Sequence, residues 1–335
     1  MSANWLGLNM LGLIQITPLH WAVFIVFVLF AVLLDLGVFH RKAHIVKIKE
    51  AIAWTVFWFA LSMLFAFFFI KPYRGDTPFH EYIAGYITEL SLSLDNVFVI
   101  AVVFSYFRVP LEYQHRVLFF GILGALVMRM VMIVLGIALI SKFHWILYLL
   151  GLFLIFSGIK LVFSGDEAPE PEKNLAIRIA RKFFPVTPNF EGQKFVVKRD
   201  GKTIITPMML VLLTVETSDI IFALDSIPAI FGITTDSFIV FTSNVFAILG
   251  LRSLYFVLAG AIRYFKYLQY GLSVILVFIG FKMVLPWAAE HINALHGFKI
   301  EAKEALLVIA GIIFVSILIS VVSALITKNS NNKSE

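Results

Sequence analysis

The sequence contains no cysteine, and only 14% of its residues are charged. Without cysteine the chain can form neither disulfide bonds nor thiolate metal sites, and nothing in it indicates a redox compartment. A soluble domain carries far more charge than this, whereas 60% of these residues are hydrophobic and the mean hydropathy is +0.93. The composition therefore predicts an all-α polytopic membrane protein.

Nine apolar runs approach or exceed the ~18–20 residues that a helix needs to cross a hydrocarbon core. The predicted spans are about 20–39, 51–70, 82–107, 117–140, 145–163, 207–231, 238–259, 267–288 and 304–326. A polar linker, about 164–206, separates the fifth and sixth spans. The first span is expected to remain as an uncleaved anchor, because no basic segment precedes it.

Lysine and arginine outside the spans are distributed unequally between the two sides of the membrane. Eighteen lie on the side of the linker and five on the other. The positive-inside rule then places the N-terminus outside and the linker and C-terminus in the cytoplasm. Topology and anionic lipid thus explain the net charge of +6, so the expected partner is the bilayer and not nucleic acid.

Two short motifs recur along the chain. The run Ile122–Gly124 reappears as Ile248–Gly250, and Gly158–Lys160 reappears in similar form as Gly280–Lys282. The third to fifth spans therefore match the sixth to eighth, and each unit has an odd number of helices, so the second copy enters the membrane from the opposite side. Inverted repeats of this kind are typical of transporters, whose substrate sites lie near the midplane between the repeats.

The predicted architecture is a single transmembrane transporter domain built around these two inverted three-helix repeats. The repeats span about 82–163 and 207–288, the cytoplasmic linker 164–206 joins them, and the flanking helices are about 20–39, 51–70 and 304–326.

Charged residues inside the predicted spans are the strongest functional signal. Asp35, Lys160 and Lys282 lie near span ends, where snorkelling to the interface is the expected behaviour. The remaining acids are Glu89, Asp95, Glu216, Asp219 and Asp225, and the remaining bases, their expected charge partners, are Arg129 and Arg252. Pairing explains any one acid, but two arginines leave three carboxylates, so a bound cation or protons must supply the balance.

The spacing of the acids predicts a shared site. Glu216 and Asp219 are three residues apart and face the same way on a helix. Asp225 is expected to be brought round to them because Pro228 disrupts the helix, as proline does where backbone lines a cavity. The span 82–107 carries two acids at the same six-residue interval and is expected to supply the other half of the site.

The available ligand atoms narrow the expected ion. Further oxygen donors within the spans are Ser93, Asn96 and Asn244. All eight histidines fall at span ends or in loops, so a zinc, copper or nickel site in the core is not expected. Carboxylate, hydroxyl and amide oxygens suit Mg²⁺, Ca²⁺ or Mn²⁺.

Three segments resemble a known family: YITELSLSLDNVFVIAVVFSYF, TVETSDIIFALDSIPAIF and TSNVFAILGLRSLYF. They are similar to the TerC family, in particular its Alx-like branch of bacterial integral membrane proteins, and the likeness runs from about residue 20 to 326. The resemblance implies Mn²⁺ export across the bacterial plasma membrane, within a superfamily related to lysine exporters. The family's acids correspond to the five intramembrane acids above. Its name refers to tellurium resistance, whose chemistry the sequence does not explain.

The leading hypothesis is therefore secondary-active export of a divalent cation, with Mn²⁺ or Ca²⁺ as substrate rather than permanent cofactor. Proton exchange is the expected drive, since no nucleotide-binding Gly-x-x-x-x-Gly-Lys-[Ser/Thr] motif occurs in this chain. One alternative is an exporter of a small amino acid or an oxyanion bound by the arginines. Another is a metal-stress membrane scaffold that recruits partners through a linker hairpin around Asp200–Gly201. No nucleophile–base arrangement is visible, so enzymatic activity is not expected.

Overall fold

The computed structural model describes residues 16–34, 46–163, 174–199, 201–259, 268–291 and 299–331. The long helices are α1 (Pro18–Leu34), α2 (Ile48–Phe65), α4 (Asp76–Tyr106), α5 (Leu111–Lys142), α6 (Ile146–Phe163), α8 (Pro207–Ile233), α9 (Ser237–Ala259), α10 (Leu268–His291) and α11 (Ala302–Asn331). The shorter elements are η3 (Ala66–Ile70), α3 (Lys71–Arg74), α7 (Leu175–Phe183), β1 (Val196–Arg199) and β2 (Lys202–Ile205).

The prediction of an all-α polytopic membrane protein is confirmed. Eight of the described helices are long and apolar enough to cross a membrane, and α1 is a shorter apolar helix. Each predicted span falls on one of these nine helices, and the second continues through η3 and α3 as one apolar stretch, Ile48–Arg74. Asp35, which was expected to snorkel, lies outside the described residues.

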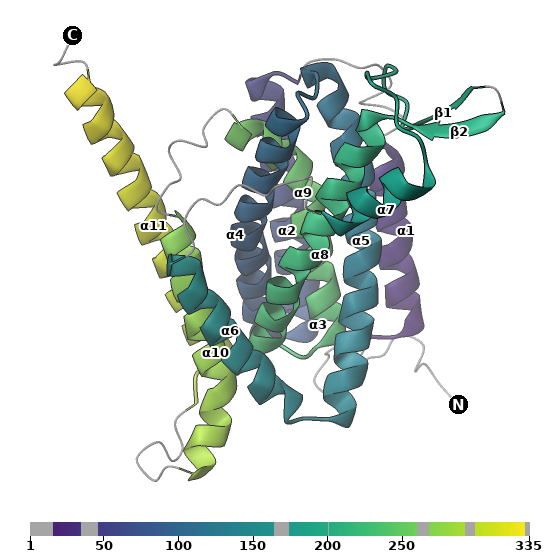
Figure 1. Ribbon diagram of the computed structural model, residues 1–335. Helices are drawn as coiled ribbons and strands as arrows, with labels where there is room; N and C mark the ends of the chain where they lie inside the picture. The colour runs from purple at the N-terminus through teal and green to yellow at the C-terminus, as the bar shows by residue number, and fades with distance from the viewer. Residues whose placement is uncertain are drawn as a thin grey trace.

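Helix α9 lies at the centre of the bundle. It packs against α2, α4 and α5. In its most apolar 18-residue stretch 83% is buried, compared with 17% of the corresponding stretch of α5. Helices α4 and α8 also pack directly on each other. The outer helices α1, α2, α5, α6 and α11 expose many large apolar side chains, as a lipid-facing surface requires. Helices α4 and α8, which carry the intramembrane acids, lie beside each other in the bundle (Figure 1).

The most extensive helix contact joins α6 and α10, and small residues make it possible. A Cβ atom on Gly280 would lie 2.5 Å from the carbonyl oxygen of Gly151, and one on Gly158 would lie 2.8 Å from the carbonyl oxygen of Ser273. The Ser273 hydroxyl also donates a hydrogen bond to the Gly158 carbonyl at 2.5 Å. Such close backbone approach is a common way to pack helices in a membrane.

These two contacts are reciprocal. Gly151 and Ser273 are 122 residues apart, and so are Gly158 and Gly280. A twofold rotation that exchanges α6 with α10 therefore carries the Gly151–Gly280 contact onto the Ser273–Gly158 contact. An inverted repeat requires its two equivalent helices to cross symmetrically in this way. The repeat itself remains a prediction.

The linker packs on the beginning of α8. Its β1 and β2 form an antiparallel hairpin in which Arg199 pairs with Lys202, as the expected turn at 200–201 requires. The Thr206 hydroxyl donates to the Lys194 carbonyl at 2.6 Å, and the buried Ile177 of α7 packs beside Ile205. In Figure 1 the hairpin lies at one end of the bundle and α3 lies towards the other. We call these two ends the linker side and the far side.

The α6–α10 crossing gives a test of the fold. Gly280→Ala is expected to lower the free energy of unfolding by about 1–3 kcal/mol, because the new methyl group meets backbone atoms that cannot move aside. The matched control is Gly311→Ala on α11, where nothing lies within 4 Å of the added carbon. Alanine there should be neutral or stabilising by up to about 1 kcal/mol. Denaturant titration in detergent micelles measures both, and equal effects would contradict the crossing.

Candidate cation site

Arg129 of α5 is buried at the meeting point of four helices. Its guanidinium forms an ion pair with Glu89 of α4, lies 3.7 Å from Asp219 Oδ1 of α8, and donates to Asn244 Oδ1 of α9 at 3.1 Å. The side chains of Arg129 and Glu89 are each 2% exposed. A buried charge requires such partners: Glu89 compensates Arg129, and Asp219 adds a second carboxylate to this Arg129 cluster.

Two oxygens of this cluster lack a partner. Asn96 donates to Asp219 Oδ1 at 3.2 Å, but Asn96 Oδ1 and Asp219 Oδ2 are buried and accept no hydrogen bond from any described residue. Both residues line a cavity of about 20 Å³, beside Ser218 and Phe222. That volume holds about one water molecule or one ion. Ser93 stabilises the cluster from α4, where its hydroxyl donates to Glu89 Oε1 at 3.4 Å.

A second, larger cavity contains one further acid from each of α4 and α8. Asp95 of α4 and Asp225 of α8 line a cavity of about 180 Å³ and lie close enough for their charges to interact. Lys160 of α6 is on the same wall, and its side chain is exposed, so the cavity reaches the surface there. The atoms Asp225 Oδ1 and Ser226 Oγ are buried without a hydrogen-bond partner among the described residues. A carboxylate and a hydroxyl oxygen are thus available to a cation.

The structure does not gather the five acids into one cage, which corrects the expectation for Asp225. Asp219 and Asp225 line different cavities, because six residues on a continuous helix turn the two side chains about 120° apart. Pro228 lies within α8 but does not bring Asp225 round to Asp219. Within the described parts of the chain, no three His, Asp or Glu side chains converge in a way that could hold a metal ion. Any cation site here rests on two carboxylates, neutral oxygens and water.

Comparison with known families shows which family this chain belongs to. The family described as "Integral membrane protein TerC family" matches residues 74–332, a range that contains all five intramembrane acids. The chain belongs to the TerC family. The resemblance read from the three sequence segments is therefore confirmed.

Relatives of this TerC-family chain are themselves described as membrane proteins. An "Uncharacterized membrane protein STKORF319" of Myxococcus xanthus is 48% identical over 308 residues, which cover 92% of this chain and 93% of that protein. The Escherichia coli K12 protein described as "Putative membrane-bound redox modulator Alx" is 48% identical over 278 residues, covering 80% of this chain and 86% of that protein. No solved structure matches the chain.

The last two predicted site residues of the TerC-family chain lie outside both cavities. Glu216 of α8 is half-buried, and its carboxylate packs against Gly124 of α5. Arg252 of α9 lies 3.1 Å from the His115 Nε2 atom of α5. The two arginines of the predicted repeats therefore have different neighbours, and Arg129 is the one that lies among the acids.

Sequence reasoning assigned Lys160 to the membrane interface and passed over Ser157. Both line the larger cavity, beside Asp95 and Asp225. The two residues are three apart and therefore share a face of α6. A polar pair at this spacing, in a helix that is otherwise apolar, was the available signal.

The Arg129 cluster predicts a measurable coupling. Arg129→Gln should destabilise the protein by about 3–5 kcal/mol, because Glu89 is left buried and uncompensated. The double variant Glu89→Gln/Arg129→Gln should recover part of this loss, with a coupling energy of about 0.5–3 kcal/mol. Unfolding in detergent measures all members of the cycle. Additive effects would show that the two side chains do not interact.

Proposed function

We propose that this protein is a secondary-active exporter of a divalent metal cation, most specifically Mn²⁺, and that Asp95 and Asp225 are its principal ligands. The observation that carries the proposal is the larger cavity, which is lined by carboxylates from two helices and by a hydroxyl that has no hydrogen-bond partner among the described residues. Hard divalent cations take such oxygen ligands and keep bound water. The choice of Mn²⁺ derives from the TerC resemblance, while the ligand chemistry derives from these residues.

The type of basic residue favours this cavity over the Arg129 cluster. Arg129 already forms an ion pair with Glu89 and lies beside Asp219, and this network ties four helices together. Lys160 lies on a flexible side chain that reaches the surface, so it can withdraw from the carboxylates when a cation arrives. The Arg129 cluster is assigned to structure, and the 20 Å³ cavity beside it to a secondary position on the ion's route.

The proposed setting is the bacterial plasma membrane, with the N-terminus outside and the linker and C-terminus in the cytoplasm. The larger cavity then faces the cytoplasm, because Ser157 and Lys160 lie near the end of α6 that leads into the linker. Mn²⁺ is a substrate in this proposal, and the chain needs no permanent cofactor, nucleic-acid partner or enzymatic step. The redox role in the name of the Alx relatives would have to act without thiols of this chain, which has no cysteine.

Flux measurements in proteoliposomes test the ion and the ligands. Wild-type protein is expected to move Mn²⁺, and Asp95→Asn and Asp225→Asn should each reduce the flux at least about tenfold, since even outer-shell partners of metal ligands matter on that scale. The matched control is Glu112→Gln, an exposed carboxylate in the first turn of α5. Parallel assays with Ca²⁺, Mg²⁺ and lysine define the substrate class. Normal Mn²⁺ flux in both aspartate variants would refute the site, and lysine flux without metal flux would favour an amino-acid exporter.

Proton coupling is tested in inside-out vesicles with an acidic lumen. If protons leave through the transporter as Mn²⁺ enters, the pH gradient should drive Mn²⁺ accumulation in the lumen. A proton ionophore should then reduce accumulation to the equilibrium level without stopping downhill flux. Undiminished accumulation after the ionophore would exclude proton exchange as the drive.

A further inference from the structure

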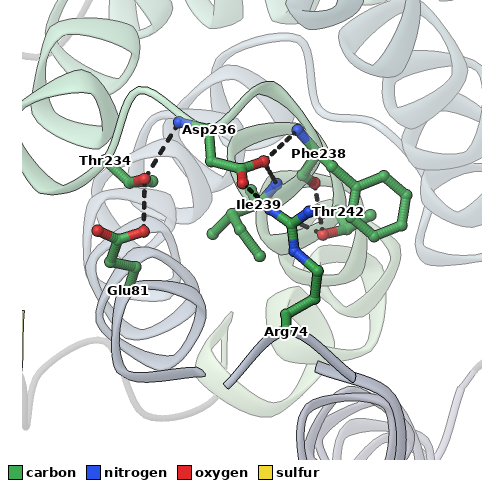
Figure 2. Close-up of polar contacts among 7 residues, drawn as sticks. All are labelled: Arg74, Glu81, Thr234, Asp236, Phe238, Ile239 and Thr242. Atoms are coloured by element: carbon green, nitrogen blue, oxygen red, sulfur yellow. Dashed lines mark hydrogen bonds and ion pairs between the residues drawn. The ribbon is translucent and has the colours of Figure 1, made fainter. Parts of the chain in front are cut away.

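The turn between α8 and α9 is tied down on the far side of the bundle. Figure 2 shows Asp236 in an ion pair with Arg74 of α3, and the Thr234 hydroxyl donating to Glu81 Oε2 of α4 at 2.6 Å. Asp236 Oδ1 also accepts from the backbone N–H groups at the start of α9, at 3.0 and 3.2 Å. This short turn therefore connects the start of α9 to α3 and α4, which are distant from it in sequence.

Helix α10 adds a third connection to the same turn. Lys282 Nζ donates to the carbonyl of Gly232 at 2.9 Å and to that of Ile233 at 3.3 Å, at the C-terminal end of α8. A lysine at a helix C-terminus satisfies carbonyls that have no partner within the helix. We call the set Arg74, Glu81, Thr234, Asp236 and Lys282 the turn lock.

Next to the turn lock the helices are closely packed. Leu154 of α6 and Ile279 of α10 are 0% exposed, and a Cβ atom on Gly232 would overlap Ile279 and Met283. Gly232 follows Asp225 towards the C-terminal end of α8, so these apolar contacts lie on the far side of Asp95 and Asp225. The linker side of the same acids holds the 180 Å³ cavity that reaches Lys160.

Residues of α4 and α6 correspond to residues of α8 and α10 at constant separations in the sequence. Three pairs of residues from α4 and α8 are 130 residues apart: Glu89 and Asp219, Leu92 and Phe222, and Asp95 and Asp225. Two pairs from α6 and α10 are 122 residues apart, the interval of the glycine crossing: Ser157 and Ile279, and Lys160 and Lys282. Both members of the second and third pairs from α4 and α8 line the larger cavity.

If the two predicted repeats exchanged conformations, the acid pair would stay in place and its entrance would move to the far side. Under this exchange Asp95 and Asp225 replace each other, whereas Ser157 becomes Ile279 and Lys160 becomes Lys282. Ser157 and Lys160, which line the open side of the cavity, therefore correspond to two residues on the side that the turn lock closes. A second state with the lock broken would present the same two carboxylates to the far side.

We propose that Asp95 and Asp225 form one site with two alternate entrances, and that the turn lock holds the far entrance shut in the state seen here. This inference rests on the transport function proposed above. When the lock opens, Lys282 leaves the α8 carbonyls and borders the far entrance as Lys160 borders the present one. Inverted repeats provide two such states by letting the halves exchange conformations around a fixed site.

Thiol accessibility tests the proposal, because the chain has no native cysteine to remove. The matched reporters are Ser157→Cys on the open wall and Ile279→Cys at the equivalent closed position. A membrane-impermeant methanethiosulfonate should modify the first from the linker side and leave the second unmodified from either side. The lock is then weakened with Asp236→Asn, which removes the charge of the ion pair but keeps an oxygen for capping α9, combined with Thr234→Val.

In the weakened lock, modification of Ile279→Cys from the far side should rise at least about tenfold, since a charge-assisted contact and a hydrogen bond no longer favour the closed state. Modification of Ser157→Cys from the linker side should fall in the same variant. The matched control is Glu191→Gln, which breaks the linker ion pair with Arg199 and should change neither rate. If the paired substitution unfolds the protein, Asp236→Asn alone provides the same test, because it removes the charge of the ion pair with Arg74.

The outcomes separate this inference from the proposed function, because accessibility is measured without any metal. Exchange of accessibility without Mn²⁺ flux would support the two entrances and refute the metal substrate. Mn²⁺ flux with Ile279→Cys protected in every lock variant would refute the two entrances alone. A rise at both reporters together would also overturn the proposal, because it would indicate general loosening rather than exchange.

Discussion

The burial of Arg129 constrains the rest of the structure. A guanidinium that is 2% exposed inside an apolar bundle must be compensated by side chains from whatever helices surround it. Glu89, Asp219 and Asn244 meet that requirement from three different helices. Their positions fix how far α4, α8 and α9 can slide past one another around α5. The central helices are thereby held by a directional polar contact, which apolar packing in lipid does not provide.

This compensation separates four of the acids of α4 and α8 into two pairs. Each helix contributes one acid to the Arg129 cluster and one, six residues further on, to the larger cavity. Phe222 lines both cavities and lies between Asp219 and Asp225 on α8. One group can therefore serve the fold while the other remains available to a cation, and the division follows from the helical rotation between the paired positions.

The spans and the intramembrane acids could be predicted from the sequence because both signals are strong. A run of twenty apolar residues has few alternative structures, and a carboxylate such as Asp95 or Asp219 within it is conspicuous. The grouping of the acids was not predictable in the same way. Expecting Pro228 to turn Asp225 towards Asp219 required a break that α8 does not make. The role of Lys160 was missed because a long side chain near a helix end can reach either the interface or the protein interior.

A site of two carboxylates suits export better than a cage of five. An exporter must bind its ion strongly enough to take it from the cytoplasm and weakly enough to release it on the other side. The Asp95–Asp225 pair beside Lys160 presents at most two negative charges to a divalent cation. Had Glu89 and Asp219 joined the same cavity without Arg129, four carboxylates would oppose release. The arginine that stabilises the bundle would thus also limit how tightly the proposed site holds a cation.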